Sequence, residues 1–314
     1  MKITILGAGG MGSRFAIKLH KKGNDVKLID GWQINVDTIK KNGIFANFNG
    51  EELFEYIPII SPEEIEKDEQ QADLIIVFTK SYQLREMLQG VKQIIGPNTY
   101  VLCLLNGMGH EEVLKEFVPK QNILLGITMW TAIMEAPGRV KLFGTGDVEM
   151  QNLEPGSDHK KFAEEVVGVL SDAGLNARYS ENVKYSIYRK AALNGTLNSL
   201  CTILECNIGQ LGKTKEAETL LKEIIAEFAA VGAKEGINLD QEEVYEHIYQ
   251  TFLGDITEHY PSMYQDLIKN HRPTEIDFIN GAISSKGTKY GVPTPYCTLL
   301  TQLIHAKEQI INVS

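Results

Sequence analysis

A glycine-rich segment directly behind a short apolar run constrains the fold of this chain more than any other feature. Residues 7–12 read GAGGMG, and the run before them, 2–6 (KITIL), has the β-branched content of a buried strand. A helical pattern over 12–22 follows, and then a second apolar run at 25–29. A glycine turn between strand and helix, followed by another strand, indicates a dinucleotide-binding unit.

Each glycine of the G-x-G-x-x-G pattern has a physical task in such a turn. Gly7 allows the tight turn, Gly9 lets backbone N–H groups approach a pyrophosphate, and Gly12 lets the helix pack closely on the strand. The helix N-terminus adds partial positive charge for the phosphates. The alternative is a purely structural turn, because any tight strand-to-helix connection can use glycine. The surrounding strand–helix–strand order favours cofactor binding.

The first half of the chain alternates short apolar runs with helical patterns, which is typical of a doubly wound parallel sheet covered on both faces. Two turn-flanked segments between 138 and 150 predict antiparallel edge strands, and a helix near 159–173 completes the domain. The expected strands are 2–6, 25–29, 73–78, 99–105 and 122–128, and the expected helices are 12–22, 33–41, 81–94 and 110–117.

From about residue 182 onward the pattern is helical throughout. The sequence therefore predicts an α/β fold with a Rossmann-type dinucleotide-binding domain at 1–180 and an all-helical substrate and dimerisation domain at 181–314. A cleft between two such domains is a common place for a small-molecule site. The helices expected in the second domain are 182–206, 214–234, 240–252, 262–270, 275–289 and 295–311.

Composition narrows the class of protein. The 314 residues carry a formal net charge of -10, and no basic stripe typical of nucleic-acid binding is present. No apolar stretch approaches the roughly 20 residues of a membrane span. These two observations lead us to expect no nucleic-acid partner and no membrane partner. The four cysteines show no C-x-x-C pairing, so we expect a cytoplasmic protein with no metal site.

Asp30 ends the second expected strand, 18 residues after Gly12. A carboxylate at this place can accept hydrogen bonds from both hydroxyls of the adenosine ribose, and it repels a 2′-phosphate. None of the next residues is basic until Lys40. The alternative role is that of a turn or helix-capping aspartate. We expect the ribose role, and with it NAD(H) favoured over NADP(H).

A polar stripe lies in the segment 188–200, YRKAALNGTLNSL. Lys190, Asn194 and Asn198 are four residues apart and therefore share one face of a helix. Asparagine is a poor helix former, so two of them among apolar neighbours need partners. One interpretation is a ladder of hydrogen bonds between the domains. The other is a site with one cation and two amides, suited to a 2-oxo acid, in which a lysine can act as a general acid. Spacing alone leaves both interpretations open.

Other polar residues follow expected strands or open expected helices. Thr79 and Lys80 follow the strand 73–78, at the carboxyl end where open α/β sheets bind ligands. Asn106 follows the next strand in the same way, although Asn-Gly is also a common turn pair. Ser262 and Glu275 lie at helix starts, where a cap or a first-turn acid is the simpler explanation.

Together and in this order, these motifs resemble the ketopantoate reductase (2-dehydropantoate 2-reductase) family over nearly the whole chain. The motifs are GAGGMG at 7–12, FTK at 78–80, LLNGMG at 104–109, RKAALNGTLN at 189–198, and PSMYQDL with RPTEIDFINGA at 261–282. The last two of these motifs are more specific to the family than the glycine loop.

The resemblance implies a function and a role for each matching residue. Lys190 is the general acid that protonates the ketone oxygen, and Glu275 supports it or the new hydroxyl. The residues expected to hold the substrate are Asn106, Asn194, Asn198 and Ser262. Those expected to bind the cofactor are Gly7, Gly9, Gly10, Met11, Gly12, Asp30, Thr79, Lys80 and Asn106.

The family resemblance also implies a hydride transfer from the nicotinamide to a branched 2-oxo acid, giving the D-2-hydroxy acid, in a homodimer. Many members have a basic residue after the second strand and prefer NADPH, whereas this chain has Asp30. A branch of NAD-dependent D-mandelate dehydrogenases keeps the lysine and takes bulkier 2-oxo acids, so ketopantoate and an aromatic 2-oxo acid both remain open as substrates. The competing class is a catalytically silent nucleotide sensor with the same fold.

Overall fold

A computed structural model describes residues 1–66, 70–154, 156–254 and 257–313. The described residues form two compact units. Unit 1 contains Met1–Leu105 and His110–Val183, and unit 2 contains Asn106–Gly109 and Lys184–Ser314. The short segment Asn106–Gly109 therefore belongs with the helical half, although it directly follows a strand of the sheet.

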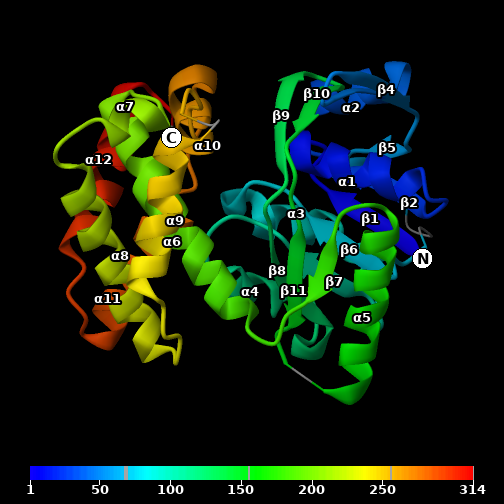
Figure 1. Cartoon of the computed structure of the whole chain (residues 1–314). Coiled ribbons are helices and arrows are strands. Elements are labelled where there is room, and N and C mark those ends of the chain that lie inside the picture. The colour runs from blue at the N-terminus through cyan, green and yellow to red at the C-terminus, as the bar shows by residue number, and fades with distance from the viewer. Residues whose placement is uncertain (67–69, 155, 255–256, 314) are drawn as a thin grey trace. The chain divides into compact units, whose positions relative to one another are not determined.

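Unit 1 is built on a mixed eight-stranded sheet, in the order β12-β11-β8-β7-β6-β1-β2-β5. The strands from β8 to β5 run parallel, and β11 is antiparallel to β8 (Figure 1). This confirms the α/β fold class with a Rossmann-type sheet. The strands are β1 (Lys2–Leu6), β2 (Asp25–Ile29), β5 (Ile59–Ile60), β6 (Leu74–Val77), β7 (Tyr100–Cys103), β8 (Ile123–Thr128), β11 (Val148–Asn152) and β12 (Ala177–Tyr179).

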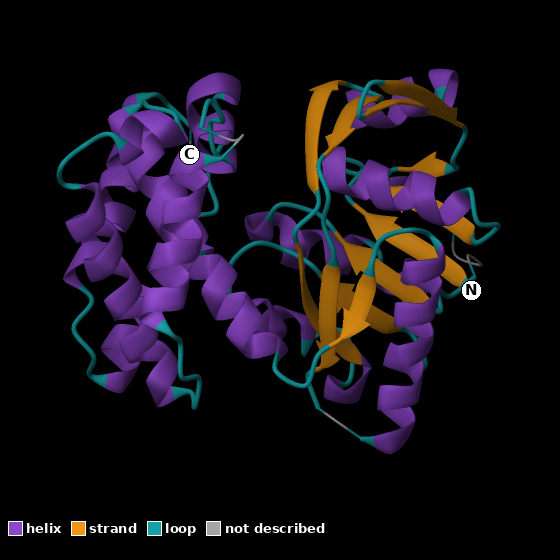
Figure 2. Ribbon diagram, viewed as in Figure 1, coloured by secondary structure: helices purple, strands orange, loops and turns teal. Residues whose placement is uncertain are grey.

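Helices cover both faces of this sheet (Figure 2). Ile3, Ile5, Leu102 and Leu124 belong to the core beneath α1 (Gly10–His20) and α5 (Ser157–Asp172). The central strands are apolar in nearly every position, because both of their faces are buried. The remaining helices of the unit are α2 (Gln33–Asn42), α3 (Leu84–Gly90), which short 3₁₀ turns flank, and α4 (His110–Leu114).

A second sheet of four strands, which we did not predict as a unit, also belongs to unit 1. Its order is β4-β3-β10-β9, with β3 and β10 parallel. The strands are β3 (Ile44–Phe48), β4 (Glu51–Glu55), β9 (Thr131–Ala136) and β10 (Arg139–Phe143). The β3–β4 hairpin turns at Asn49 and Gly50, both with positive φ, so the Asn-Gly pair was a usable signal.

The expectation of two antiparallel edge strands between 138 and 150 needs correction. The first, β10, belongs to the small sheet, where β9 and β3 flank it. The second, β11, is antiparallel as expected, but β12 pairs along its outer side, so β11 is not an edge. With only three residues, β12 is too short to give a sequence pattern.

Unit 2 is helical, as predicted, with α6 (Val183–Leu204) as its longest helix. The expected helices at 262–270 and 275–289 are interrupted: the first continues as a π-helical turn over Gln265–Lys269, and the second is a 3₁₀ turn, Ile276–Phe278, followed by α11. The remaining helices are α7 (Ile208–Gly212), α8 (Ala217–Lys234), α9 (Gln241–Leu253), α10 (Ser262–Tyr264), α11 (Asn280–Tyr290) and α12 (Pro295–Ile310).

Candidate functional site

The structure explains the glycines at 7, 9 and 12 in different ways. Gly7 has φ +95°, and a Cβ there would lie 2.7 Å from the Phe78 backbone. A Cβ on Gly12 would lie 1.8 Å from the Gly7 carbonyl oxygen, so this glycine allows α1 to start against β1. A Cβ on Gly9 would meet no atom within 4 Å. The fold therefore does not need a glycine at position 9, and open space above it is what a close-lying phosphate requires.

Buried hydrogen bonds hold the turn on both sides of Ala8. Its N–H donates to the Oδ2 atom of Asp30, and its carbonyl accepts from the Ser13 hydroxyl (3.1 Å) and the Asn35 amide (3.1 Å). Asn35 is fully buried and also accepts the Gly138 N–H at 2.9 Å, which ties the turn to the small sheet. The N–H groups at the start of α1 are thus preorganised, and α1 has no acidic residue in its first turn to oppose an anion. Asn35 gave no signal in the sequence, because its partners are distant in the chain.

Asp30 lies directly after β2, and its carboxylate also accepts the Trp32 N–H at 2.7 Å. Burial raises the pKa of Asp30 above its ordinary value, whereas the backbone hydrogen bonds from Trp32 and Ala8 act in the opposite direction. Both the turn role and the ribose role are therefore compatible with the geometry. Each carboxylate oxygen accepts one backbone N–H and retains acceptor capacity for a hydroxyl.

Thr79 and Lys80 follow β6 at its carboxyl end, as expected. Thr79 is buried, and its hydroxyl oxygen has no hydrogen-bond partner within the described part of the chain. Lys80 is half-buried and precedes Ser81, whose hydroxyl lies 3.0 Å from Nε2 of the buried His110. These features fit a nicotinamide dinucleotide. Its polar atoms can pair with the Thr79 hydroxyl and with the N–H groups of the glycine turn.

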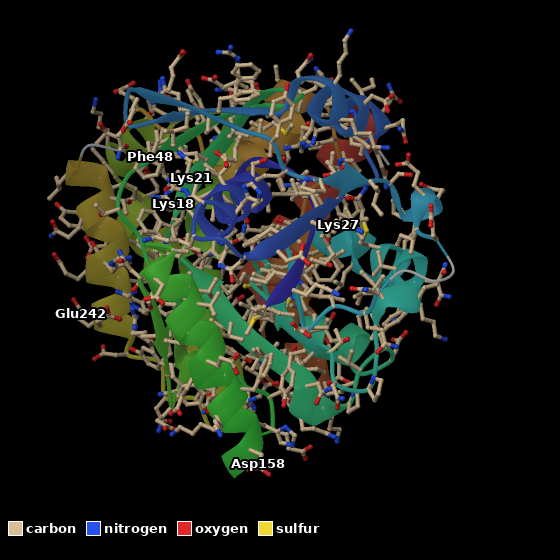
Figure 3. All side chains as sticks on the ribbon, turned by 90° about the vertical axis from the view of Figure 1, so that its right-hand side faces the viewer. Lys18, Lys21, Lys27, Phe48, Asp158 and Glu242 are labelled. Atoms are coloured by element: carbon tan, nitrogen blue, oxygen red, sulfur yellow. The ribbon has the colours of Figure 1, made fainter. Side chains whose placement is uncertain are left out.

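A buried arginine anchors α1 on the small sheet. Arg14 is fully buried, donates to the carbonyls of Thr131 (2.9 Å) and Phe143 (3.0 Å), and lies over the Trp130 ring at 4.5 Å. Burial lowers the pKa of Arg14 to about 10. One turn later, the Lys18 ammonium lies 4.4 Å from the ring centroid of Phe48, on the face that Figure 3 displays. These contacts fix the helix whose N-terminus forms the glycine turn.

In unit 2, α6 carries the predicted polar stripe. Lys190 is half-buried, and Asn194 and Asn198 are buried on the same helix at four-residue steps. The Asn198 amide donates to the hydroxyl of Ser262 at 3.3 Å, so two predicted substrate residues meet although they are 64 positions apart. An amide beside a hydroxyl can bind a carboxylate or a carbonyl oxygen.

Asn280, which the sequence did not single out, supports this part of α6. It is fully buried, accepts the Ser199 hydroxyl at 2.7 Å and donates to the Gly195 carbonyl at 3.0 Å. Its Nδ2 also lies 3.8 Å from the Cys297 sulfur. Gly195 has no room for a side chain, because a Cβ there would lie 2.6 Å from the Phe228 ring. Asn280 and Phe228 therefore pack against α6 at Gly195 and Ser199, next to Asn194 and Asn198.

The segment Asn106–Gly109 is bound to the 3₁₀ turn that follows Glu275. The Met108 N–H donates to the Phe278 carbonyl at 2.8 Å, and Gly107 has φ +93° with no space for a Cβ against that carbonyl. Asn106 is half-buried, and Glu275 is buried just before the turn. Glu275 therefore does not lie in the first turn of an α-helix, as considered above. It directly precedes the 3₁₀ turn Ile276–Phe278.

The predicted site residues thus fall into two sets. The glycine turn with Gly10 and Met11, Asp30, Thr79 and Lys80 belong to unit 1. The set in unit 2 contains Asn106, Lys190, Asn194, Asn198, Ser262 and Glu275. No helix among the described residues is long and apolar enough to cross a membrane, and these residues contain no group of acidic, histidine or cysteine side chains arranged for a metal ion.

Known proteins resemble the chain over its full length. The 2-dehydropantoate 2-reductase of Lactococcus lactis subsp. lactis (strain IL1403) is 55% identical over 315 residues, which cover 99% of each chain. The 2-dehydropantoate 2-reductase of Streptococcus pyogenes serotype M1 is 47% identical and covered completely, as is this chain. A structure of D-mandelate dehydrogenase with NADH and anilino(oxo)acetate is 56% identical, with a TM-score of 0.96 and complete coverage of both chains.

The dinucleotide turn, the fold and these relatives make the chain an NAD(P)-dependent oxidoreductase that reduces 2-oxo acids. The family model of ketopantoate reductase PanE/ApbA matches residues 3–155, and that of its C-terminal region matches 182–308. The chain belongs to the ketopantoate reductase family.

Proposed function

We propose that this enzyme reduces a bulky 2-oxo acid to the D-2-hydroxy acid with NADH in the cytoplasm. The carrying observation is the stripe of Lys190, Asn194 and Asn198 on α6, which combines one cation with two amides on one helix face. A 2-oxo acid presents a carboxylate and an adjacent ketone oxygen, which such donors recognise.

When bound, NADH supplies the hydride that goes to the carbonyl carbon. Lys190 donates a proton from Nζ to the ketone oxygen, so that the carbonyl becomes a hydroxyl. Asn106, Asn194, Asn198 and Ser262 bind and orient the substrate. The Asn198–Ser262 hydrogen bond holds two of these groups in register before substrate arrives. Glu275, buried beside the segment that carries Asn106, supports Lys190 or binds the new hydroxyl.

Asp30 supports the preference for NADH. Its carboxylate is held in place by two backbone N–H groups at the end of β2. A fixed, partly buried negative charge suits a ribose diol and opposes a 2′-phosphate. The 56% identical D-mandelate dehydrogenase has NADH bound in its structure.

Two substrates have separate support. The D-mandelate dehydrogenase structure contains anilino(oxo)acetate, an aromatic analogue of a 2-oxo acid with an amide in place of the ketone, which favours a mandelate-type substrate. The name 2-dehydropantoate 2-reductase of the 55% identical relative favours ketopantoate and a place in pantothenate biosynthesis. With Asp30 in the cofactor turn, we favour the bulkier aromatic or branched 2-oxo acid.

A substrate panel with NADH and NADPH tests the proposal. The absorbance of the reduced cofactor is followed with ketopantoate, benzoylformate and 2-oxo acids with branched aliphatic side chains. We expect the highest kcat/KM for benzoylformate or a 3-branched 2-oxo acid with NADH. If activity is highest on ketopantoate, the enzyme is a ketopantoate reductase and the preference for a bulkier 2-oxo acid is wrong. Tight NADH binding without turnover of any panel member selects a silent nucleotide sensor.

We also propose a homodimer through α12. Leu299, Leu303 and Ile310 are 53%, 42% and 77% exposed, and with the exposed Ala306 they form a stripe at steps of four, three and four residues. This spacing is that of a helix seam that packs on another helix. The flanking Gln302 and Gln309 are uncharged, and the flanking Lys307 is paired with Glu205 at 2.7 Å, so charge repulsion between two copies at the stripe is small.

Sedimentation velocity tests this assembly. Wild-type enzyme should sediment as a dimer, and Leu303→Glu should give a monomer that retains its helical content, because a charge would enter the seam. Leu253→Glu, at a 65% exposed leucine on α9, is the control and should leave the dimer intact. A monomeric wild type, or a Leu303→Glu dimer of unchanged stability, contradicts the proposal.

A further inference from the structure

Trp32 occupies a position that folding alone does not explain. It is the N-cap residue of α2, with φ −86° and ψ 92°, and its side chain makes no capping hydrogen bond. Serine, threonine, aspartate and asparagine are strongly preferred at this position, because their oxygens accept a first-turn N–H. Trp32 is also 45% exposed. An exposed indole at an uncapped helix start stabilises the fold little, which indicates another role.

The other tryptophan of the chain shows the difference. Trp130 donates from Nε1 to the Leu175 carbonyl at 2.9 Å, and its ring lies against the Arg14 guanidinium. Within the described ranges, the Trp32 indole makes no hydrogen bond, ring stack or cation–π contact. A buried indole usually finds a partner for its N–H, whereas an exposed one offers a flat apolar face.

The neighbours of Trp32 place this face beside the proposed ribose site. The Trp32 backbone N–H donates to Asp30 Oδ1 at 2.7 Å, so the position of the residue is tied to that carboxylate. The chain bends at Gly31 and Trp32 is only two residues from Asp30, so the indole starts next to a ribose held at that carboxylate. Gly31 leaves the surface between them open, because a Cβ there would meet only the Met87 methyl carbon at 4.0 Å. Ile34, 62% exposed, extends the apolar surface.

We propose that Trp32 is the stacking platform for the adenine ring of the dinucleotide. The inference rests on the proposed cofactor site and assigns separate tasks to two neighbouring residues. Asp30 binds the ribose diol and sets the preference of the enzyme for NADH over NADPH. Trp32 binds the base, which both cofactors share, and sets the affinity for each of them equally.

Fluorescence titration with AMP tests the proposal without turnover. AMP carries the adenine, its ribose and one phosphate, which is the adenosine half of the cofactor, and oxidised nicotinamide mononucleotide carries the other half. In Trp130→Phe enzyme, Trp32 is the sole tryptophan, because the chain contains two. AMP should quench its fluorescence, and nicotinamide mononucleotide should not.

Calorimetric affinities then separate stacking from structure. Trp32→Ala should raise the Kd for AMP, NADH and NADPH by roughly tenfold each, within the range of base stacking on aromatic side chains. Trp32→Phe should restore most of this affinity, since it keeps an aromatic face, and Trp32→Leu should not. Tyr56→Ala removes a 61% exposed aromatic ring of the same unit and serves as the control with unchanged Kd.

The outcomes distinguish this inference from the proposed function. Unchanged AMP affinity in Trp32→Ala overturns the platform, even if the enzyme reduces 2-oxo acids. An equal loss of affinity for nicotinamide mononucleotide shows a structural effect on the whole site and also overturns it. If no 2-oxo acid is reduced but AMP binding depends on Trp32 as described, the platform stands and the proposed reaction fails.

Discussion

The carboxylate of Asp30 accepts the backbone N–H of Ala8, 22 residues earlier, inside the glycine turn. The proposed selector of the ribose therefore also stabilises the glycine turn. Substitutions at Asp30 act on both functions, and the choice of variant decides which effect dominates.

Wild-type enzyme should prefer NADH over NADPH by at least about tenfold in kcat/KM. Two negative charges about 4 Å apart repel by roughly 4 kcal/mol at an effective dielectric of 20, and tenfold needs only about 1.4 kcal/mol. Asp30→Asn removes the charge but keeps one acceptor, so the preference should shrink with little loss of Tm. Asp30→Ala should also lower Tm, and Asp30→Arg should reverse the preference. Steady-state kinetics with both cofactors measures the ratio, and a wild type that prefers NADPH contradicts the assignment.

Lys190→Ala should lower kcat by at least about a hundredfold, because general-acid catalysis typically contributes 10²–10⁴. The Kd for NADH, measured by fluorescence, should stay nearly constant, since the glycine turn, Asp30 and Thr79, which are expected to bind the cofactor, belong to the other unit. Lys184→Ala, at an exposed lysine of the same helix, is the matched control and should retain kcat. Near-normal turnover in Lys190→Ala would remove this lysine from the mechanism.

Asn198→Ala and Ser262→Ala should each raise KM for the 2-oxo acid more than KM for NADH. The two side chains are hydrogen-bonded to each other at 3.3 Å, so their effects should be less than additive in the double variant. Ser285→Ala, at an exposed serine of α11, controls for the loss of a hydroxyl. If the variants lower only Tm and leave KM unchanged, the residues have a purely structural role.

Asn280→Ala should lower the free energy of unfolding by about 1–3 kcal/mol, because it leaves the Ser199 hydroxyl and the Gly195 carbonyl without this buried partner. Urea unfolding followed by circular dichroism measures the change. Asn270→Ala removes an exposed asparagine and should cost much less. Equal effects of the two substitutions would mean that Asn280 does not support α6.

Glu235 makes the stability of unit 2 sensitive to acid. Burial raises the pKa of this carboxyl, but hydrogen bonds from Lys286, Tyr188 and Tyr290 outweigh burial and hold it below its ordinary value of 4.5. The unfolded chain then binds the proton at a higher pH than the folded one, so this contribution is present above pH 4.5 and is lost as pH falls through the folded pKa.

Tm measured against pH checks this linkage. Wild-type Tm should fall more steeply than that of Glu235→Gln as the pH drops below about 4.5, because glutamine does not titrate there. The two variants should converge at the lowest pH that the protein tolerates. Parallel curves would show that Glu235 contributes no pH-dependent stability.

The sequence by itself determined the features that depend on neighbouring residues. The glycine turn, the apolar central strands, the helical second half and the spacing of Lys190, Asn194 and Asn198 follow from local conformational preference and periodicity, because their signals lie within a few residues. The resemblance of several ordered motifs then indicated the family, which the matches at 3–155 and 182–308 confirm. The roles given to individual site residues stay predictions.

Only the tertiary structure decided which distant residues meet. It joined β3 to β10 about 95 residues later in a second sheet, buried Arg14 against that sheet, and brought Asn280 to the back of α6. It also moved Asn106 into unit 2 and placed Ser262 against Asn198. These contacts depend on packing and on the pairing of buried polar groups across the chain, which a single sequence does not specify, since many partners of similar chemistry are available to each residue.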